Sequence, residues 1–235
     1  MMVDASPGAS QDAPKRSARL VLIGPPGAGK GTLAENLCSF SFDHISSGEI
    51  FRGHVRNQTS LGQRLEKSLA DGQLVSDDLT LETMKKWFWS RKPNQGFLLD
   101  GFPRTLPQAR AFDEWLESRS LKLDAVIHLY LEEDAVVERI AHRRVCPKDG
   151  RVYHLLYNPP AKEGICDDCG TELIQRPDDR EPIIRERLRI YRQKTEPVLA
   201  YYREQGILLT QDSDRHAAEL AKTVQQKLQP FLAIR

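Results

Sequence analysis

A glycine-rich loop between two short structured segments limits, more than any other feature, how this chain can fold. The loop runs from Gly24 to Thr32, reads GPPGAGKGT and contains the pattern Gly-x4-Gly-Lys. Before it, residues 19–23 (RLVLI) form a short apolar run of the kind found in buried parallel strands. Behind it, residues 33–38 have helical spacing of apolar residues. Strand, glycine loop and helix in this order predict one half of a βα unit.

Further apolar segments repeat this alternation along the chain. The expected strands are residues 96–100, 125–131 and 207–210, and the expected helices are residues 134–144 and 217–228. Strands that alternate with helices favour an α/β fold, in which a doubly wound parallel sheet is flanked by helices. The sequence therefore predicts a core of this class, built around the glycine loop.

The glycine loop has the composition of a phosphate-binding site. Its glycines let successive backbone N–H groups turn inward at the start of a helix, where they form a nest for an anion. Lys30 can then reach the β- and γ-phosphates of a nucleotide, and Thr32 can support a metal ion or its waters. The alternative is a plain Gly/Pro turn, against which the position between strand and helix counts. The expected contacts with a donor nucleotide are Gly27, Ala28, Gly29, Lys30, Gly31 and Thr32.

Two stretches interrupt the alternation of strands and helices. Residues 46–75, here called the helical segment, have a helical pattern rich in Arg, Gln and Ser. Residues 145–182, here called the insert, hold three of the four cysteines and a Pro-Pro pair. We expect both to be small units added to a core, and residues 1–18 to be a disordered polar tail. The core would then consist of residues 19–45, 76–144 and 183–235.

Composition excludes several classes of protein. Lys and Arg number 34 against 33 Asp and Glu, a formal net charge of +1, which argues against a polybasic nucleic-acid or membrane-surface binder. No window approaches the ~18–20 apolar residues that a membrane span needs. The first 18 residues lack the apolar stretch of a signal peptide, and two aspartates argue against a transit peptide. Clustered thiols favour a reducing compartment, so we expect a cytoplasmic protein.

Three motifs together carry a resemblance to a known family. They are the loop Gly-x-Pro-Gly-x-Gly-Lys-Gly-Thr, the sequence Asp-Gly-Phe-Pro-Arg at residues 100–104, and the long insert. With them, residues 20–212 resemble the adenylate kinases, of the long-lid bacterial type. The resemblance implies reversible, magnesium-dependent phosphoryl transfer, ATP + AMP to 2 ADP. It also implies that the helical segment binds the nucleoside monophosphate and that the insert is a lid similar to a zinc ribbon.

By this resemblance, single arginines hold the acceptor. Arg52 and Arg104 would bind the α-phosphate of AMP, because a guanidinium pairs bidentately with phosphate and stays charged. Gln108 would read the adenine edge. The other acceptor contacts that the family implies are Ser47, Gln73, Leu74, Val75, Gly101, Arg176 and Arg187. The family usually has Ser-Thr-Gly-Asp where this chain has Ser-Ser-Gly-Glu (residues 46–49), so a methyl group near the base is lost at Ser47.

The resemblance assigns the donor side as well. Asp100 would hold magnesium through water, with support from Thr32. Arg139 and Arg143 are four residues apart in the expected helix 134–144, which would place both on one face. By family position, Arg139 would stack on the donor adenine, Tyr153 of a lid motif would contact ATP, and Arg143, Arg176 and Arg187 would clamp phosphates beside Asp178 and Asp179. The residues expected to carry catalysis are Lys30, Arg104, Arg143, Arg176 and Arg187.

The cysteines of the insert have the spacing of a metal site. Cys146 and Asp149 form one pair, and Cys166 and Cys169 form another after 16 intervening residues. Three thiolates and a carboxylate can complete tetrahedral zinc, and metal would stabilise a unit with little core of its own. The alternative is a metal-free lid held by hydrogen bonds. His154 is a competing ligand whose spacing fits a structural role better, and Cys38 is expected in the apolar core.

Two rival functions remain open from the sequence. One is a kinase for GMP, UMP or CMP, for which Gln108 and Ser47 are the residues to test. The other is a P-loop switch whose zinc ribbon binds a partner or nucleic acid, against which the near-zero charge counts. We expect a monomer that binds ATP, AMP and ADP, without nucleic acid or membrane as partners. The aromatic run at residues 87–89 is expected to be buried helix packing.

Overall fold

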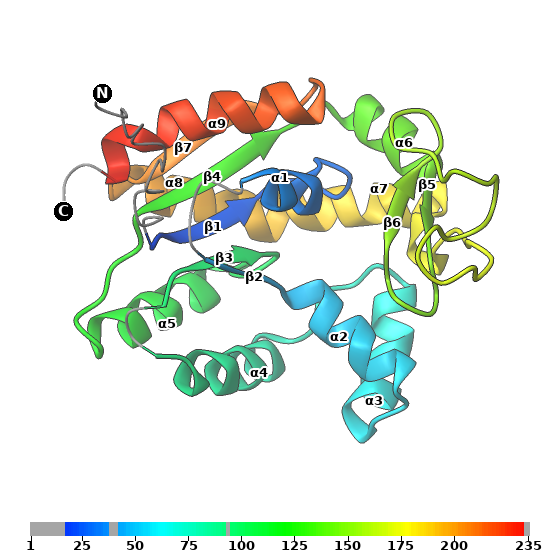
Figure 1. The fold of residues 1–235 in the computed structure, drawn as a ribbon. Helices are drawn as coiled ribbons and strands as arrows, with labels where there is room; N and C mark the ends of the chain where they lie inside the picture. Colours follow the sequence, from blue (N-terminus) through cyan, green and yellow to red (C-terminus); the bar gives the residue numbers. More distant parts are fainter. Residues whose placement is uncertain (1–16, 38–41, 93–94, 233–235) are drawn as a thin grey trace, which may run out of the picture.

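The computed structural model describes residues 17–37, 42–92 and 95–232 (Figure 1). Within them lies a five-stranded sheet of order β2-β3-β1-β4-β7, in which every neighbouring pair is parallel. The strands are β1 (Arg19–Ile23), β2 (Asp43–Ser46), β3 (Phe97–Asp100), β4 (Ala125–Tyr130) and β7 (Leu208–Asp212). The predicted α/β class is confirmed. The sequence pattern missed β2, a strand of four residues of which none is buried.

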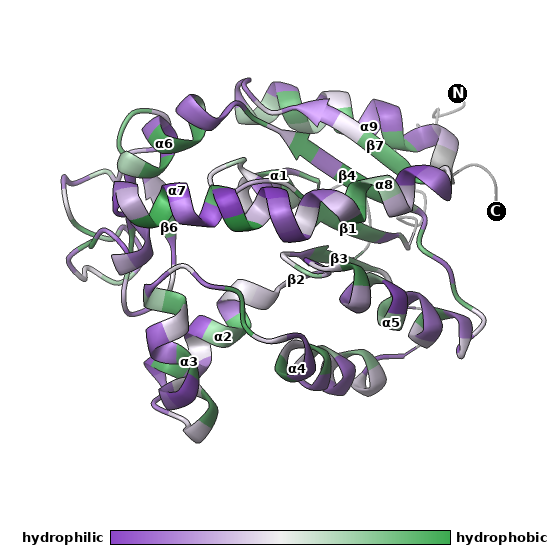
Figure 2. Cartoon of the chain, turned by 180° about the vertical axis from the view of Figure 1, so that it is seen from behind, coloured by the Kyte–Doolittle hydropathy of each residue, from purple (hydrophilic) through white to green (hydrophobic). Residues whose placement is uncertain are grey.

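Helices cover both faces of this sheet. One core cluster joins it to α1 (Lys30–Asn36), α6 (Glu133–Ala141), α7 (Glu181–Ile190) and α9 (Ala217–Leu232). The other joins it to α4 (Asp77–Ser90), α5 (Leu106–Glu117) and α8 (Glu196–Glu204). Because side chains alternate along a strand, Leu20 and Leu22 enter the first cluster while Val21 and Ile23 enter the second. Figure 2 accordingly shows β1 and β3 mostly green, whereas α7 alternates between green and purple.

The predicted helix at residues 134–144 is too long at its carboxyl end. Helix α6 ends at Ala141, and the short strand β5 (Arg143–Val145) begins two residues later. β5 pairs antiparallel with β6 (Val152–His154) at the entrance to the insert. Arg143 therefore lies on a strand and not on the helix that carries Arg139. The expectation that these two arginines share one helix face is wrong.

The helical segment and the insert each have a small core of their own. In the segment, α2 (Ser47–Arg56) and α3 (Ser60–Ala70) enclose Phe51, Leu65 and Val75. In the insert, Cys146, Tyr153, Cys166 and Leu173 form a buried cluster, and the 3-10 turn η1 (Pro177–Asp179) leads into α7. Figure 1 shows both units at the edge of the sheet where the parallel strands end.

Three smaller expectations concern the tail, Cys38 and the aromatic run. Residues 1–16 of the predicted tail and Cys38 lie outside the described residues, but Ala18 is buried and its carbonyl accepts the Phe97 N–H at 2.7 Å. Ala18 thus belongs to the core. Trp89 is 46% exposed, so the expected burial of the aromatic run is wrong there; its ring packs under the Arg119 guanidinium, 4.3 Å from the ring centroid. Among the described helices none is long and apolar enough to cross a membrane.

Candidate active site

The glycine loop connects the central strand β1 to α1, as predicted. Gly27 and Gly29 have φ angles of 76° and 82°, a region that side chains rarely adopt. A Cβ atom on Gly27 would also lie 2.9 Å from Ile140 Cγ1, so the loop packs too closely against α6 for any other residue. The Lys30 ammonium donates to the carbonyls of Gly24 (3.0 Å) and Pro25 (2.9 Å). The lysine therefore folds back over the loop, which places its charge where the nest would hold phosphate.

Charged groups from three other elements influence this lysine. Burial lowers the pKa of Lys30 to about 8; the Asp100 carboxylate opposes this shift, and the charges of Arg104, Arg187 and Arg143 add to it. Asp100 ends β3, which is paired with β1 so that Leu22 and Asp100 are in register. Parallel neighbouring strands end at the same edge, so the predicted magnesium carboxylate lies beside the loop. Thr32 is exposed in the first turn of α1.

The loop after β3 brings the acceptor residues together. Both the Ser47 hydroxyl and the Arg104 Nε donate to the Gly101 carbonyl, each at 2.7 Å. Gly101 has a φ of 77°, and a Cβ atom there would lie 2.8 Å from Arg104 Nη2 and 2.9 Å from Ser47 Oγ. Only glycine fits at this crossing. The structure thus joins the predicted residues Ser47, Gly101 and Arg104 in one contact, between the start of α2 and the core.

Four arginines from separate elements are held in place by three carboxylates. Asp179 accepts from Arg143 through both carboxylate oxygens, and from Arg187 at 3.3 Å. Asp178 accepts from the same Arg187 at 2.8 Å. The predicted orienting role of this acidic pair agrees with these contacts, because both aspartates fix guanidinium groups that would otherwise be free to rotate.

Glu49 is the third carboxylate, and it links the helical segment to the end of the insert. Its Oε1 accepts from Arg52 Nη2 at 2.6 Å and from Arg176 Nη2 at 3.1 Å. Gln73 makes a second link, donating to Glu186 of α7 at 3.2 Å. The sequence singled out Glu49 only as a departure from the family pattern. Its contact with Arg176, 127 residues away, had no sequence signal.

The arginines carry more positive charge than their partners neutralise. Burial, with the charges of Arg52 and Arg143, lowers the pKa of Arg176 to about 9. Burial likewise lowers the pKa of Arg187 to about 10 and the pKa of Arg104 below its usual value. A pKa is depressed in this way when the charged form lacks solvation and anions. The cluster is therefore suited to an anionic ligand with several charges.

Gln108 lies between Arg104 and the start of α4, next to the acceptor residues. Gln108 is 2% exposed; its Oε1 accepts the Arg104 backbone N–H at 2.8 Å, and its Nε2 donates to Asp77 at 2.7 Å. Both ends of the amide are thus engaged within the protein. Gln108 thus supports the Arg104 backbone while one N–H and one lone pair of its amide stay available, and its reading of an adenine edge stays a prediction. Leu74 is half-buried and Val75 is buried in the core of the helical segment.

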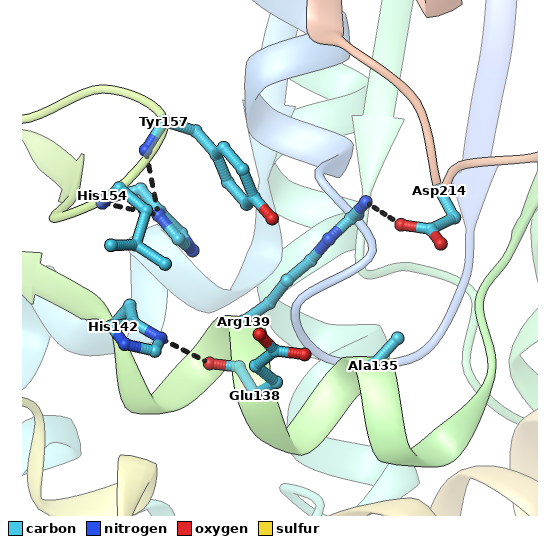
Figure 3. Close-up of a pocket in the computed structure, with 8 residues that line it drawn as sticks. Ala135, Glu138, Arg139, His142, His154, Tyr157 and Asp214 are labelled. Atoms are coloured by element: carbon cyan, nitrogen blue, oxygen red, sulfur yellow. Dashed lines mark hydrogen bonds and ion pairs between the residues drawn. The ribbon is translucent and has the colours of Figure 1, made fainter.

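Arg139 borders a separate pocket between α6, the insert and the loop after β7. Its guanidinium donates to Ser213 O and to Asp214 Oδ1, both at 2.9 Å. Figure 3 shows Arg139 across from the stacked rings of His154 and Tyr157, whose centroids are 4.5 Å apart. The pocket is lined by Ala135, Glu138, Arg139, His142, His154, Leu156, Tyr157 and Asp214. No sequence pattern indicated His142 or Tyr157 as pocket residues, and His154 was considered only as a metal ligand; all three line this pocket because the insert folds back onto α6.

Tyr153 lies on the other side of β6, inside the insert. It is 1% exposed, and its hydroxyl accepts the Asp167 N–H at 2.8 Å and donates to Cys166 Sγ at 3.5 Å. A buried ring with these partners packs the insert and does not face the pocket of Arg139. The contact between Tyr153 and ATP that the resemblance implies stays a prediction.

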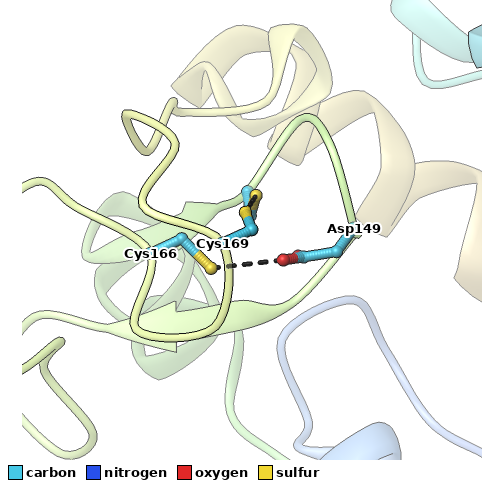
Figure 4. A group of neighbouring side chains, drawn as sticks. Asp149, Cys166 and Cys169 are labelled. Atoms are coloured by element: carbon cyan, nitrogen blue, oxygen red, sulfur yellow. Dashed lines mark hydrogen bonds between the residues drawn. The ribbon is translucent and has the colours of Figure 1, made fainter.

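The four predicted metal ligands converge. Ligand atoms of Cys146, Asp149, Cys166 and Cys169 all lie within 4.8 Å of one another. The Cys146 and Cys169 sulfurs are 3.4 Å apart, and Cys166 Sγ is 3.3 Å from Asp149 Oδ2, as Figure 4 shows for the latter pair. The Arg151 N–H holds the pKa of the Asp149 carboxyl well below its usual range, so this group is ionised and able to ligate. His154 is not part of the cluster.

The two halves of this cluster are equivalent turns. In the first, Gly150 N–H donates to the Cys146 carbonyl at 3.0 Å, and in the second Gly170 N–H donates to the Cys166 carbonyl at 2.9 Å. Both glycines have positive φ, 85° and 69°. Asp149 therefore occupies the place that Cys169 has in the second turn. Three thiolates and one carboxylate at the corners of two such turns fit a tetrahedral metal ion.

Fold and site together define a P-loop nucleotide phosphotransferase. The sequence model of the adenylate kinase family matches residues 22–207. Curated adenylate kinases similar to the chain include that of Streptomyces lividans, 50% identical over 82% of this chain and 96% of the relative, and that of Finegoldia magna, 47% identical over 83% and 91%. The adenylate kinase of Caldicellulosiruptor bescii is 42% identical over 89% of this chain and 98% of its own length.

The chain belongs to the adenylate kinase family. Its enzyme class is therefore that of the nucleoside monophosphate kinases, and its reaction is the reversible transfer of a phosphoryl group between ATP and AMP, with Mg²⁺ bound to ATP. The alternative of a P-loop switch that binds a partner through a zinc ribbon is set aside by this membership.

Proposed function

We propose that the cationic cluster binds the phosphates of donor and acceptor in one continuous site. The observation that carries this proposal is the convergence of cations from separate parts of the chain, with Arg143 and Arg187 both bonded to Asp179 and Arg104 bonded to Gly101. Burial lowers the pKa of Lys30, and the charges of Arg104, Arg187 and Arg143 add to this shift, which agrees with that convergence. Moving a phosphoryl group between two nucleotides requires that several phosphates be neutralised and that the attacking and leaving oxygens be brought into line. Cations gathered around one lysine meet both requirements.

On the donor side, the backbone nest of residues 27–32 and Lys30 hold the β- and γ-phosphates. Arg143, Arg176 and Arg187 complete the clamp, kept in reach by the carboxylates described above. Asp100 and Thr32 are the residues that would hold magnesium through water. When bound, the ion neutralises charge on the donor phosphates; alignment and water exclusion fall to the protein's own residues. No protein base is needed, because the attacking phosphate oxygen is already ionised.

On the acceptor side, Arg52 and Arg104 hold the α-phosphate of AMP. Ser47 and Gly101 fix the spacing between these arginines, since their mutual hydrogen bond ties α2 to the loop of Arg104. Gln73, Leu74 and Val75 line the acceptor pocket between the helical segment and α4. Residues 46–75 and 145–182 then act as the nucleotide-binding segment and the lid on a core formed by the rest of the ordered chain.

For the donor base we propose the pocket of Arg139. Besides its stacked rings, this pocket presents a buried His154 Nε2 that has no hydrogen-bond partner among the described residues. His154 Nδ1 accepts the N–H groups of Leu156 (3.2 Å) and Tyr157 (3.3 Å), so the neutral ring carries its proton on Nε2. An unsatisfied donor beside a guanidinium and aromatic faces suits a purine ring with acceptor nitrogens.

For the insert we propose a structural zinc ion held by Cys146, Asp149, Cys166 and Cys169. The equivalence of its two turns supports this ligand set. The thiols Cys146, Cys166 and Cys169 are all free, which favours a reducing compartment such as the cytoplasm. We further propose that the enzyme works as a monomer, which sedimentation of the purified chain can test.

The test is ADP formation from MgATP with AMP, GMP, UMP or CMP offered separately. Fast turnover with AMP and slow turnover with the other three is the expected result. Equal or faster turnover with another monophosphate would overturn the proposed acceptor site while leaving the phosphate clamp intact. No turnover with any of them, under conditions in which ATP binds, would contradict the clamp itself.

A further inference from the structure

Arg104 is held by a residue that the proposed mechanism does not use. The Arg104 N–H donates to Gln108 at 2.8 Å, and its Nε donates to Gly101 at 2.7 Å. A third bond comes from Thr195, whose hydroxyl donates to the Arg104 carbonyl at 3.0 Å. Thr195 lies 91 residues further along the chain, and neither a motif nor the family resemblance pointed to it.

Thr195 ends a π-helical turn, η2 (Tyr191–Thr195), between α7 and α8. The buried face of the long helix changes sides here: Ile184 and Leu188 of α7 belong to one core cluster, whereas Val198 and Leu199 of α8 belong to the other. π-helical turns are rare and occur frequently at functional sites. At this turn the helix meets the loop of Arg104.

The contact between Thr195 and Arg104 is partly buried. Thr195 is 6% exposed, and its hydroxyl has the Arg104 carbonyl as its acceptor. A partly buried carbonyl that loses its donor is poorly compensated by solvent, so the loop would shift to find another partner. Because Gln108 holds the N–H of the same residue, the peptide groups on both sides of Arg104 are fixed.

We propose that Thr195 is a positioning residue for the acceptor, which acts by fixing the Arg104 backbone and thereby the direction of its guanidinium. The same helix carries Arg187, so one continuous element would set the positions of two phosphate-binding arginines. This inference rests on the proposed role of Arg104 at the acceptor phosphate. It predicts a defect that concerns AMP and spares ATP.

The experiment compares Thr195→Val, which keeps the shape and removes the hydroxyl, with Thr195→Ser, which keeps the hydroxyl. Thr83→Val is the matched control, because Thr83 also donates to a carbonyl, that of Leu79 at 2.8 Å, but far from the site on α4. For Thr195→Val we expect kcat/KM for AMP to fall about three- to tenfold, the usual worth of one hydrogen bond, with an unchanged KM for ATP. Thr195→Ser should have the wild-type kcat/KM for AMP. Thr83→Val should have the wild-type kcat/KM for AMP and the wild-type KM for ATP.

Arg104→Ala tests whether Thr195 acts through Arg104. In that background, Thr195→Val should have no further effect on kcat/KM for AMP, because the guanidinium it positions is gone. Additive losses in kcat/KM for AMP, or equal increases in KM for AMP and for ATP, would overturn the inference in favour of a general structural role. If Arg104→Ala alone left the KM for AMP unchanged, the proposed acceptor site would fail, and that result is distinct from a failure of the Thr195 inference.

Discussion

The phosphate loop and the arginine cluster, which we propose bind the same kind of ligand, are built in different ways. The loop is one contiguous stretch, residues 24–32, whose shape follows from two positive-φ glycines and close packing on α6. The cluster is assembled from α2, the loop after β3, β5, the end of the insert and α7. Its side chains are held by Glu49, Asp178 and Asp179 and, for Arg104, by the Gly101 carbonyl. A backbone site is thus specified locally, whereas a side-chain site depends on carboxylate partners distant in the sequence.

If the loop depends on local geometry, removing its lysine should stop the reaction without disturbing the fold. Lys30→Met is expected to lower kcat by about 10²- to 10³-fold, as does the loss of one preorganised charge stabiliser elsewhere. The melting temperature should change little, because the Lys30 ammonium contacts only two carbonyls of its own loop. Lys86→Met, at an exposed pair with Glu82, is the control. Near-normal turnover of Lys30→Met would contradict the phosphate assignment.

The arginine cluster should instead lose stability when a carboxylate is neutralised. Asp179 is 1% exposed and bonds two arginines, so Asp179→Asn would leave a buried guanidinium uncompensated. We expect a loss of about 3 kcal/mol in urea unfolding, together with reduced turnover. Asp178→Asn is the matched variant, with a single arginine partner and a more accessible side chain, and its loss should be smaller. Equal effects of the two variants would show that burial of the carboxylate does not matter.

The insert offers a third case, in which the proposed zinc ion would add to a small core. If zinc binds only the folded insert, then free zinc at one hundred times its Kd stabilises by about 2.7 kcal/mol, and chelation should remove this contribution and lower the Tm by several degrees. Asp149→Asn should reduce zinc retention measured by elemental analysis. Asp168→Asn, in the same insert but outside the cluster, should retain it. A chain that binds no zinc and melts unchanged after chelation would refute the metal site.

The sequence predicted the local features of this site better than the features assembled from distant parts of the chain. The loop, the edge position of Asp100 and the spacing of the four metal ligands are contiguous or strand-end patterns, and each lies where predicted. One expectation failed at the end of a helix: Arg143 lies on strand β5 and not on the helix of Arg139. The contacts of Gln108 with Asp77 and of Tyr153 with Cys166 were not indicated by any sequence pattern. Periodicity cannot reveal where a helix stops at a short strand, nor which partner a buried amide finds.

The pH dependence of nucleotide binding gives the smallest predicted effect. Because the pKa of Lys30 in the free enzyme is about 8, its charge is present below that pH and is lost above it. ATP affinity measured by calorimetry should therefore weaken above pH 8, by at most about tenfold per pH unit for one proton. Lys30→Arg keeps its charge and should flatten this slope. A wild-type affinity independent of pH from 7 to 9.5 would contradict the lowered pKa.

Folding stability should respond to the same proton in the opposite direction. The lysine pKa is lower in the folded chain, about 8, than its ordinary value of 10.5, so unfolding takes up a proton between these values. Stability relative to Lys30→Met should therefore rise with pH from about 8 to 10.5. Urea unfolding of both proteins across this range measures the difference.

The most direct test of a single continuous site is the binding of one molecule that spans it. Two adenosines joined through five phosphates would place one base in each pocket and the phosphates along the loop and the arginines. Calorimetry should give one molecule bound per chain, with an affinity at least about a hundredfold above that of ATP or AMP alone, because the second base binds intramolecularly. Arg104→Ala and Lys30→Met should each remove much of this gain. An affinity no better than that of ATP would contradict the account, because the loop and the arginine cluster would then be two separate sites.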